Sequence, residues 1–391
     1  MNTRGAQSVT HARETLERAL LAVQADARCE VFQRCTRRVS LEIEQGRVRV
    51  RQGVEEGTAV RLHAGEALHF GAASGVGIEA AREAVARASA LPGALLPDRE
   101  PPWAGGMELL DVEDASELPT REAMEQWLRH AAGTARASLD AAVGVEALGT
   151  GDGLRACRVR GTVWARRLEG TRVRSAVARR LERLDPEDWE EPARYEKPES
   201  VVERIFLEGI ALLPAAVGAL VPALVAAVPV GSPAGPGWVC DDAPGEPDAP
   251  GGGVFDDTGF PAGQLQLADG RRVLAIPRGP GRRRRHSFRE PPVERAVNLR
   301  FLRRGTWHGS GLLARAARIH AGGAHWSVVL DAALARDGRP LSPWRPWVVH
   351  GPPEAWVASC EAMVRPIQRT PEGVRSGTLV FGGQSLRASS F

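Results

Sequence analysis

Two successive stretches between residues 41 and 70 alternate apolar with polar or charged side chains, and this pattern constrains the fold more than any other. In residues 41–50, the dipeptide Gln45-Gly46 interrupts the alternation at a position suited to a turn. In residues 59–70, the interruption falls at Ala64-Gly65. Strands with one buried face alternate in this way, and a short turn between two of them makes a β-hairpin. The sequence therefore predicts two consecutive hairpins.

Helical patterns precede and follow these hairpins. Residues 8–23 carry an apolar stripe at helical spacing, and the alanine-rich segment from Ile78 has high helix propensity. Residues 91–119 are rich in Pro, Gly and acidic residues, which is typical of a linker. Further helices are predicted at 120–142 and from Pro198 to about Leu213.

The remaining residues are predicted to be mainly β-structure. A long loop is expected at 231–253, where Pro, Gly and Asp are dense, and short strand-like segments separated by turns follow it. The predicted fold class is α+β, with N-terminal α/β domains of helices and antiparallel hairpins followed by a mainly β C-terminal domain. The predicted domains are residues 1–95, 118–213 and 214–391.

Charge and apolar content exclude several classes of protein. The 51 basic and 48 acidic side chains nearly cancel, so composition gives no indication of nucleic-acid binding. The most apolar run, residues 210–230, is interrupted by prolines and a glycine, and it is interpreted as a buried core segment rather than a membrane helix. The N-terminus shows no signal-peptide pattern, so a cytoplasmic protein without a membrane span is expected. The five cysteines are scattered and suggest neither a disulfide framework nor a zinc knuckle.

Three groups of residues follow one another along most of the chain. The first group lies in the hairpin region: Gly57, Arg61, Gly65, Phe70, Gly71 and Ala72. The second group is an Asp-Asp and Gly pattern: Asp241, Asp242, Asp256, Asp257, Gly259, Asp269 and Gly270. The third group follows it: Arg284, Arg285, Pro291, Pro292, Asn298 and Leu299, with LVFGG near the end of the chain. Together these groups resemble the TldD/PmbA family, the modulator of DNA gyrase type of zinc metallopeptidase. The resemblance implies the fold of that family over most of the chain.

Catalytic members of the family resemble zinc peptidases that carry His-Glu-x-x-x-His on a helix at the start of the third domain. The histidines hold the metal and the glutamate can polarise the bound water. Here the motif position is occupied by Pro222, Ala223 and Ala227, none of which can bind zinc or transfer a proton. Pro222 also suggests that the local helix is displaced. The family's remaining ligand is a cysteine, for which Cys360 is the candidate, and an ordinary buried thiol is the simpler interpretation.

Other constellations give little support for a replacement site. His63 and His69 lie on the second hairpin and could meet in space, but no carboxylate is spaced to complete a metal site. Asp256-Asp257 could suggest calcium binding or acid-base chemistry. Flanked by Thr and Gly, this pair is more typical of a turn whose side chains cap backbone amides. No catalytic residue and no metal ligand are therefore predicted in this chain.

The run Arg282–Arg285, with Phe288 nearby, is the most unusual local feature and has three interpretations. It could bind nucleic acid through phosphates and stacking, or it could be a solvated loop, as charge runs usually are. The resemblance places it along a substrate cavity, where guanidinium groups could bind a peptide carboxylate. On that third interpretation the substrate-binding residues are Arg283, Arg284, Arg285, Phe288 and Asn298.

The resemblance implies a function through a partner. In this family, a chain that keeps the zinc motif often pairs with a TldE/PmbA-like chain that lacks it, and the complex trims peptides, including precursors of modified peptide natural products. The sequence therefore predicts a non-catalytic subunit without a cofactor of its own, in a heteromer with a TldD-like subunit that holds the zinc. The alternative is a stand-alone protein on the same scaffold that binds peptides or nucleic acid.

Overall fold

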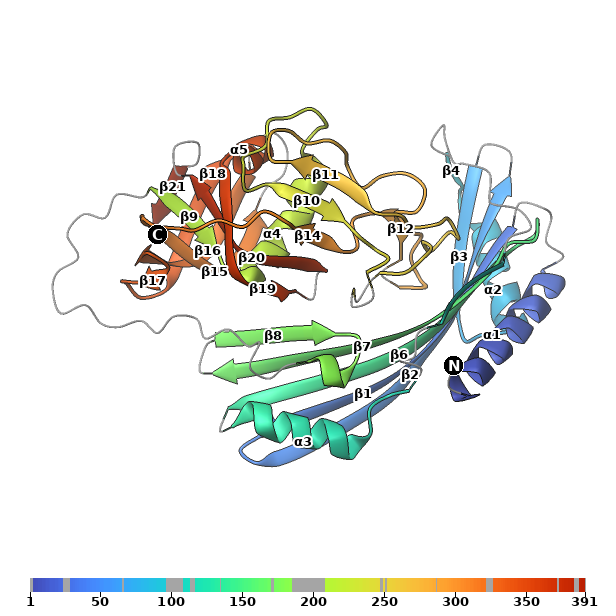
Figure 1. Cartoon of the computed structure of the whole chain (residues 1–391). Coiled ribbons are helices and arrows are strands. Elements are labelled where there is room, and N and C mark those ends of the chain that lie inside the picture. Colours follow the sequence, from blue (N-terminus) through green and yellow to red (C-terminus); the bar gives the residue numbers. More distant parts are fainter. Residues whose placement is uncertain are drawn as a thin grey trace.

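Two large β-sheets, with helices packed on them, form the computed structural model of the chain (Figure 1). The structure describes residues 3–23, 29–64, 67–95, 108–112, 117–133, 135–169, 172–184, 208–246, 249, 252–285, 287–320, 326–370, 373–382 and 387–390. The helices in these ranges are α1 (Thr3–Ala22), α2 (Ile78–Ala90), α3 (Arg121–Ala132), α4 (Pro214–Ala227), α5 (Pro353–Ala358) and the 3₁₀ helix η1 (Leu181–Arg183).

The first sheet is built by the N-terminal half of the chain. Its strands follow the order β4-β3-β2-β1-β6-β7-β5, and β8 also pairs with β7. Neighbours are antiparallel except β5, which runs parallel to β7. The strands are β1 (Cys29–Glu44), β2 (Arg47–Ala64), β3 (Ala67–Ser74), β4 (Ala94–Leu95), β5 (Glu108–Val112), β6 (Arg136–Thr150), β7 (Arg155–Glu169) and β8 (Arg172–Ala178). Because β1 and β6 pair along almost their whole length, the sheet joins the first two predicted sequence ranges.

The two faces of the first sheet are covered differently. On β1, Val31 packs in a core with α1 and α2, and Leu41 packs in a core with α3. Phe32 packs instead against Phe255 and Phe288 of the C-terminal half. Since successive side chains of a strand point to opposite faces, the three helices lie on one face and the C-terminal half lies on the other, as Figure 1 shows.

The second sheet belongs to the C-terminal half. Its order is β11-β10-β14-β20-β9-β15-β16-β18-β21, with β17 on β16 and β19 on β20. Its strands are β9 (Gly209–Leu212), β10 (Val239–Asp242), β11 (Leu265–Asp269), β14 (Leu299–Phe301), β15 (Ser310–His320), β16 (Trp326–Arg336), β17 (Arg339–Pro340), β18 (Arg345–Gly351), β19 (Cys360–Arg369), β20 (Val374–Gly382) and β21 (Arg387–Ser390). A separate two-stranded sheet pairs β12 (Arg283–Arg284) with β13 (Val293–Glu294). The apolar helices α4 and α5 pack against the second sheet in the largest core.

The predicted fold class, α+β, is confirmed, and so are the two hairpins. β1 and β2 meet at Gln45 and Gly46, whose φ angles of 50° and 76° give the two left-handed residues that a tight hairpin turn of type I′ requires. β2 and β3 form the second hairpin, although residues 65 and 66 of its turn lie outside the described residues. The helices predicted at 8–23 and from Ile78 correspond to α1 and α2.

Four sequence predictions differ from the structure. The long loop predicted at 231–253 contains strand β10. The helix predicted at 120–142 ends at Ala132, because Gly133 takes a left-handed φ of 55° and residues 136–142 join β6, where residues 137–142 alternate between buried and partly buried. The predicted linker at 91–119 contains strand β5. The helix predicted up to Leu213 is a strand at Gly209–Leu212, and its earlier part lies outside the described residues.

The apolar run at 210–230 divides between β9 and α4, both inside the core of the second half. Within the described ranges, the structure contains no helix that is both long enough and apolar enough to cross a membrane.

Candidate functional site

The helix at the predicted motif position, α4, is intact. It begins at Pro214 and continues through Pro222 to Ala227, and the backbone N–H of Val228 still donates to the carbonyl of Leu224 at 3.0 Å. The helix is therefore continuous through Pro222, and the expectation that it is displaced stays a prediction. A proline inside a helix removes one N–H donor, but packing of this helix in the largest core holds the element together.

The side chains at the three motif positions lie away from the most buried face of α4. Pro222 and Ala223 are half-buried and Ala227 is exposed, whereas Leu220 and Leu224 are fully buried. All three motif positions present only carbon and hydrogen atoms to their surroundings. The three motif positions thus lie on a helix and carry no side chain that could bind a metal.

Cys360, the candidate for the remaining ligand, lies at the start of β19 and is fully buried. Burial raises the pKa of its thiol well above the ordinary value, and the nearby Cys240 raises it further. A thiol in this environment stays protonated and is a poor metal ligand. Across the described residues, no group of three or more His, Cys, Asp and Glu side chains is placed to hold a metal ion. His69 pairs across the strands with Leu62, the residue before His63. Successive residues of a strand point to opposite faces, so His63 and His69 lie on opposite faces of the first sheet.

The run Arg282–Arg285 is not a solvated loop. Arg282, Arg284 and Arg285 are 5%, 2% and 6% exposed, and only Arg283 is half-buried. Arg285 donates to Glu30 of β1 at 2.6 Å and lies over the ring of Phe32, 4.6 Å from its centroid. Arg282 donates to Asp242 at 2.7 Å. The solvated-loop interpretation is wrong, because the guanidinium groups of Arg282 and Arg285 bind buried carboxylates in distant parts of the chain.

The Asp256-Asp257 turn is confirmed as a capping turn. Asp256 accepts hydrogen bonds from the backbone N–H groups of Thr258 at 2.8 Å, Phe260 at 3.1 Å and Arg283 at 3.1 Å. Gly259 completes the turn with a φ of 84°. Sequence reasoning found this turn but missed what the neighbouring Asp257 does.

Asp257 joins the two halves of the molecule. Its carboxylate accepts from Arg158 of β7 at 2.5 Å and from the backbone N–H of Arg285 at 2.6 Å. Burial alone would raise the pKa of Asp257, but the charges of Arg158 and Arg284 and the backbone hydrogen bond outweigh it and hold the pKa well below its usual range. The group stays ionised in the interior as a result.

Arg158 binds two carboxylates at this contact. Besides Asp257 it donates to Glu146 of β6, which also lies 3.5 Å from Arg34. Burial opposes the charge of Glu146, yet Arg158 and then Arg34 lower its pKa below the ordinary value. We call the set Glu30, Glu146, Arg158, Asp257 and Arg285 the inter-sheet ion network.

The other two predicted substrate-binding residues are also internal. Phe288 is 1% exposed and packs on β2, so close to Gly57 that a Cβ there would lie 2.2 Å from the ring. Asn298 is fully buried and donates to the carbonyl of Ala243 at 2.8 Å and to Glu246 at 2.7 Å. These contacts give Phe288 and Asn298 a structural role in the interior. A role in substrate binding for the five predicted residues stays a prediction.

A pocket of about 450 Å³, which we call the junction pocket, opens where the two halves meet. Its walls are β3 from Phe70 to Ser74, the end of α2 at Arg87 and Leu91, and Phe288 with Arg289. Arg289 is exposed and lies over the Phe288 ring, 5.3 Å from its centroid, while Arg87 donates to the carbonyl of Ala72 at 2.8 Å. Of the five predicted residues, Phe288 is the one that lines this pocket. Sequence reasoning missed Arg87, whose helical position gave no sign that it would face the C-terminal half.

Comparison with known proteins identifies the fold. No protein-family model matches the sequence, and no curated protein matches it. Among the solved structures that match, three cover nearly the whole chain at 13% sequence identity. TldE from Thermococcus kodakarensis has a TM-score of 0.70 and covers 97% of this chain and 100% of its own. The other two are described as candidate modulators of DNA gyrase. The one from Bacteroides thetaiotaomicron has a TM-score of 0.67 and covers 100% of both chains. The one from Thermotoga maritima has a TM-score of 0.64 and covers 96% of this chain and 99% of its own. The chain therefore has the fold of TldE and of these modulators.

Proposed function

We propose that this chain is a non-catalytic, TldE-like subunit of a heteromeric TldD-type zinc metallopeptidase that processes peptides. One observation carries the proposal. The chain has the fold of TldE over nearly its full length, and its helix α4 presents Pro222, Ala223 and Ala227 where a zinc peptidase of this fold would carry its motif. A scaffold kept without ligands needs another role, and completing a partner's site is the simplest one.

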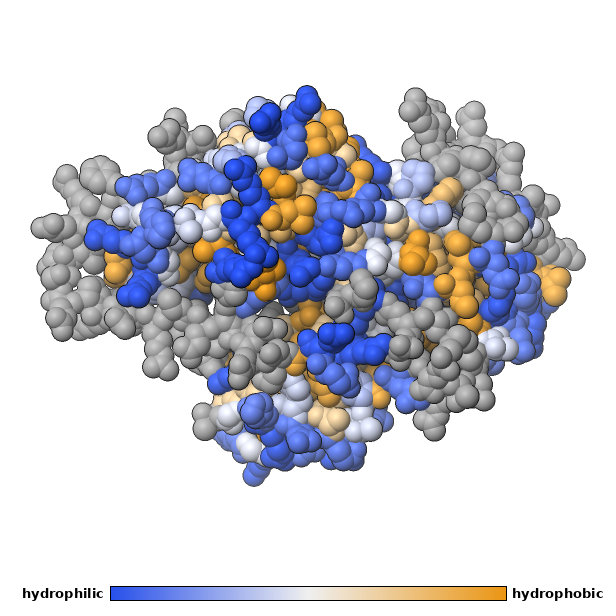
Figure 2. Space-filling model, viewed as in Figure 1, coloured by the Kyte–Doolittle hydropathy of each residue, from blue (hydrophilic) through white to orange (hydrophobic). Residues whose placement is uncertain are grey.

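The proposal places the zinc and the acid-base chemistry in the partner subunit. This chain would supply the enclosing surface, and the junction pocket lined by Phe288 and Arg289 offers an apolar wall with a cationic rim. Such a rim suits a peptide carboxylate or acidic side chain. Hydrophobic areas also lie among hydrophilic side chains on the face drawn in Figure 2, and Val254, Val293 and Leu302 are about half exposed. A partner interface would cover some of these side chains. Maturation of a modified peptide natural product in the cytoplasm is the setting that we propose.

The alternative, a stand-alone binding protein, divides into two cases. A nucleic-acid interface needs guanidinium groups that are free to reach phosphates, and burial of Arg282, Arg284 and Arg285 removes the strongest sequence argument for it. A stand-alone peptide-binding protein is still favoured by the junction pocket. It differs from the subunit hypothesis in needing no partner.

The test is to express this chain with a motif-bearing homologue from the same genome. We expect a stable heteromer by size-exclusion chromatography with light scattering, peptidase activity in the mixture, and none in this chain alone. The matched control is the same mixture with the motif glutamate of the homologue changed to glutamine, which should form the complex without activity. Peptide hydrolysis by this chain alone in excess chelator would refute the proposal, as would failure of the two chains to associate.

Restoring the motif gives a second test. The triple variant Pro222→His, Ala223→Glu and Ala227→His should fold, because these side chains are half-buried or exposed on an intact helix. It should not become a peptidase alone, because Cys360 is enclosed in the core and cannot complete the ligand set. Measured zinc content and peptidase activity of the triple variant check this. Activity in the variant alone would show that the chain holds the remaining ligand.

A further inference from the structure

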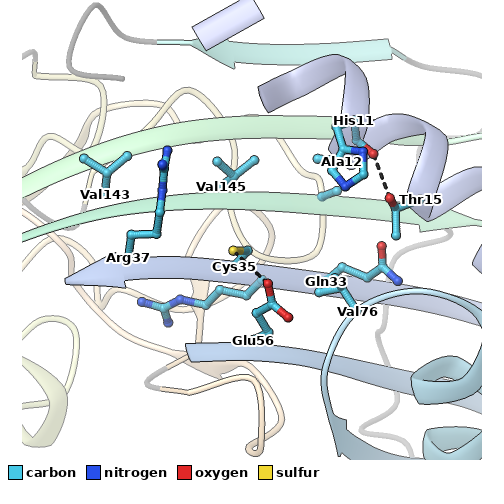
Figure 3. Close-up of a pocket in the computed structure, with 12 residues that line it drawn as sticks. His11, Ala12, Thr15, Gln33, Cys35, Arg37, Glu56, Val76, Val143 and Val145 are labelled. Carbon is cyan, nitrogen blue, oxygen red and sulfur yellow. Dashed lines mark hydrogen bonds between the residues drawn. The ribbon is translucent and has the colours of Figure 1, made fainter. Parts of the chain in front are cut away.

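A second pocket, of about 270 Å³, lies on the helix-bearing face of the first sheet, between α1 and α3 (Figure 3). It lies on the opposite side of the sheet from the inter-sheet ion network. Gln33, Cys35 and Arg37 follow one another along β1 on this face, since alternate residues of a strand share a face. The middle of α1 closes one side through His11 and Thr15. The volume lies just below the range of about 300–1,000 Å³ that is usual for drug-sized ligands, so it suits a smaller molecule.

The floor of the pocket is apolar. β6 contributes Val143 and Val145, which are the cross-strand partners of Arg37 and Cys35. In the view of Figure 3, the Arg37 side chain reaches across to β6 between these two valines. Ala12 and Val76 add further apolar surface at the edge. A ligand in this pocket would place a hydrocarbon group on the valines.

One buried donor in the pocket wall has no partner. Gln33 is 4% exposed, and its amide nitrogen makes no hydrogen bond to any residue that the structure describes. A buried polar group without a partner costs free energy, and native proteins seldom leave one unsatisfied. The Gln33 amide therefore needs an acceptor oxygen from a molecule that enters the pocket.

Two opposite charges in the pocket are also available. Arg37 is exposed and forms no ion pair with any carboxylate in the described part of the chain. Glu56 of β2 is exposed and accepts a hydrogen bond from the Cys35 thiol at 3.4 Å. Burial and this carboxylate raise the pKa of Cys35 to about 11, so the thiol is neutral and the negative charge belongs to Glu56 alone.

The register brings these charges close without pairing them. Cys35 stands directly opposite Glu56, and Arg37 stands opposite Val54, so Arg37 and Glu56 are diagonal neighbours on the same face. Diagonal neighbours in an antiparallel pair are about 7–8 Å apart. Two long side chains at that spacing can hold an ammonium and a carboxylate that belong to one small molecule.

We propose that this pocket binds a free α-amino acid with an apolar side chain. Arg37 binds the carboxylate, Glu56 binds the ammonium group, and the side chain lies on Val143 and Val145. The inference does not depend on the proposed subunit function, because it concerns the opposite face of the sheet and the isolated chain.

The experiment is isothermal titration calorimetry of the full chain with L-leucine. Three analogues separate the parts of the ligand: leucinamide lacks the carboxylate, 4-methylpentanoate lacks the ammonium group, and L-glutamate lacks the apolar side chain. We expect leucine to bind. Leucinamide and 4-methylpentanoate should each bind at least about tenfold more weakly, which is the usual loss for one charge-assisted contact. L-glutamate should also bind more weakly, because its charged side chain would lie on the valines.

Variants with matched controls test the residues. Arg37→Gln and Glu56→Gln should each weaken leucine binding about tenfold, whereas Arg38→Gln and Glu55→Gln should not change it. These controls remove the same charges one residue away, at exposed positions on the other face of the same strands. Circular dichroism should show all four variants folded, since the changed side chains are exposed. Absence of leucine binding at about 10 mM, equal binding of 4-methylpentanoate, or equal effects of the Arg37 and Arg38 changes would overturn the proposal.

Discussion

Replacing Arg158 with methionine should destabilise the chain more than any change of an exposed arginine. Arg158 is 3% exposed, and its guanidinium contacts the carboxylates of Asp257 and Glu146, which are also largely enclosed. Without it, two carboxylates remain in the interior and repel one another. Breaking a buried ion pair from one side typically costs about 3–5 kcal/mol.

The structure favours the lower end of that range. Arg34 stays 3.5 Å from Glu146, and the backbone N–H of Arg285 still donates to Asp257, so neither carboxylate loses every partner. We therefore expect a loss of about 3 kcal/mol, which is a large part of the roughly 5–15 kcal/mol that stabilises a typical domain. The double variant Arg158→Met with Asp257→Asn should recover part of this loss, because one of the two stranded charges is then absent.

The assay is urea unfolding at neutral pH, followed by circular dichroism and by tryptophan fluorescence. The matched control is Arg129→Met on α3, whose pair with Glu125 is 52% and 27% exposed. An exposed pair four residues apart on a helix contributes only about 0.3–0.5 kcal/mol. If Arg158→Met costs no more than Arg129→Met, the inter-sheet ion network does not hold the two halves together and the reasoning is refuted.

Two further predictions concern the same contact. Gly57→Ala should destabilise the chain by about 1–3 kcal/mol, because its Cβ would lie 2.2 Å from the Phe288 ring. The control is Gly53→Ala on the same strand, where a Cβ meets nothing within 4 Å. Thermal unfolding of both variants checks this, and equal midpoints would contradict it. The native pKa of Asp257 lies below its unfolded value of about 3.9, so its stabilising effect should be complete above about pH 5 and should be lost as the pH falls through the native pKa. Urea midpoints between about pH 6 and pH 3 should therefore fall less steeply in Asp257→Asn than in the wild-type chain, and parallel slopes would argue against the assignment.

Local pattern was sufficient for the elements whose partners are close in sequence. The β1–β2 and β2–β3 hairpins pair neighbouring segments, and the turn at Gln45-Gly46 has the residues that its geometry needs. The alanine-rich helix α2 likewise follows from propensity alone. The segment 136–142 was misassigned because its alanines suit a helix, and pairing with β1 about a hundred residues earlier makes it a strand instead.

The ion pairs of the candidate site could not be predicted from the sequence, because their partners are also far apart along the chain. Arg285 finds its carboxylate at Glu30, 255 residues away, and Arg158 finds Asp257 at a separation of 99 residues. A run of arginines viewed alone resembles a solvated loop, because nothing adjacent shows which carboxylates will neutralise it. The predicted position of α4, by contrast, came from the family resemblance and is where the structure has a helix.

The ionic character of the contact between the sheets has a consequence for synthesis on the ribosome. Arg158 leaves the ribosome 99 residues before Asp257, which at about 5–20 residues per second is a wait of roughly 5–20 s. During that interval the first sheet can already be paired while its uncovered face waits for the second half. That face presents Glu30, Glu146 and Arg158 beside its aromatic residues, and charged side chains discourage premature association with other nascent chains. The same groups that join the halves in the finished protein would thus keep the first half from aggregating before the second arrives.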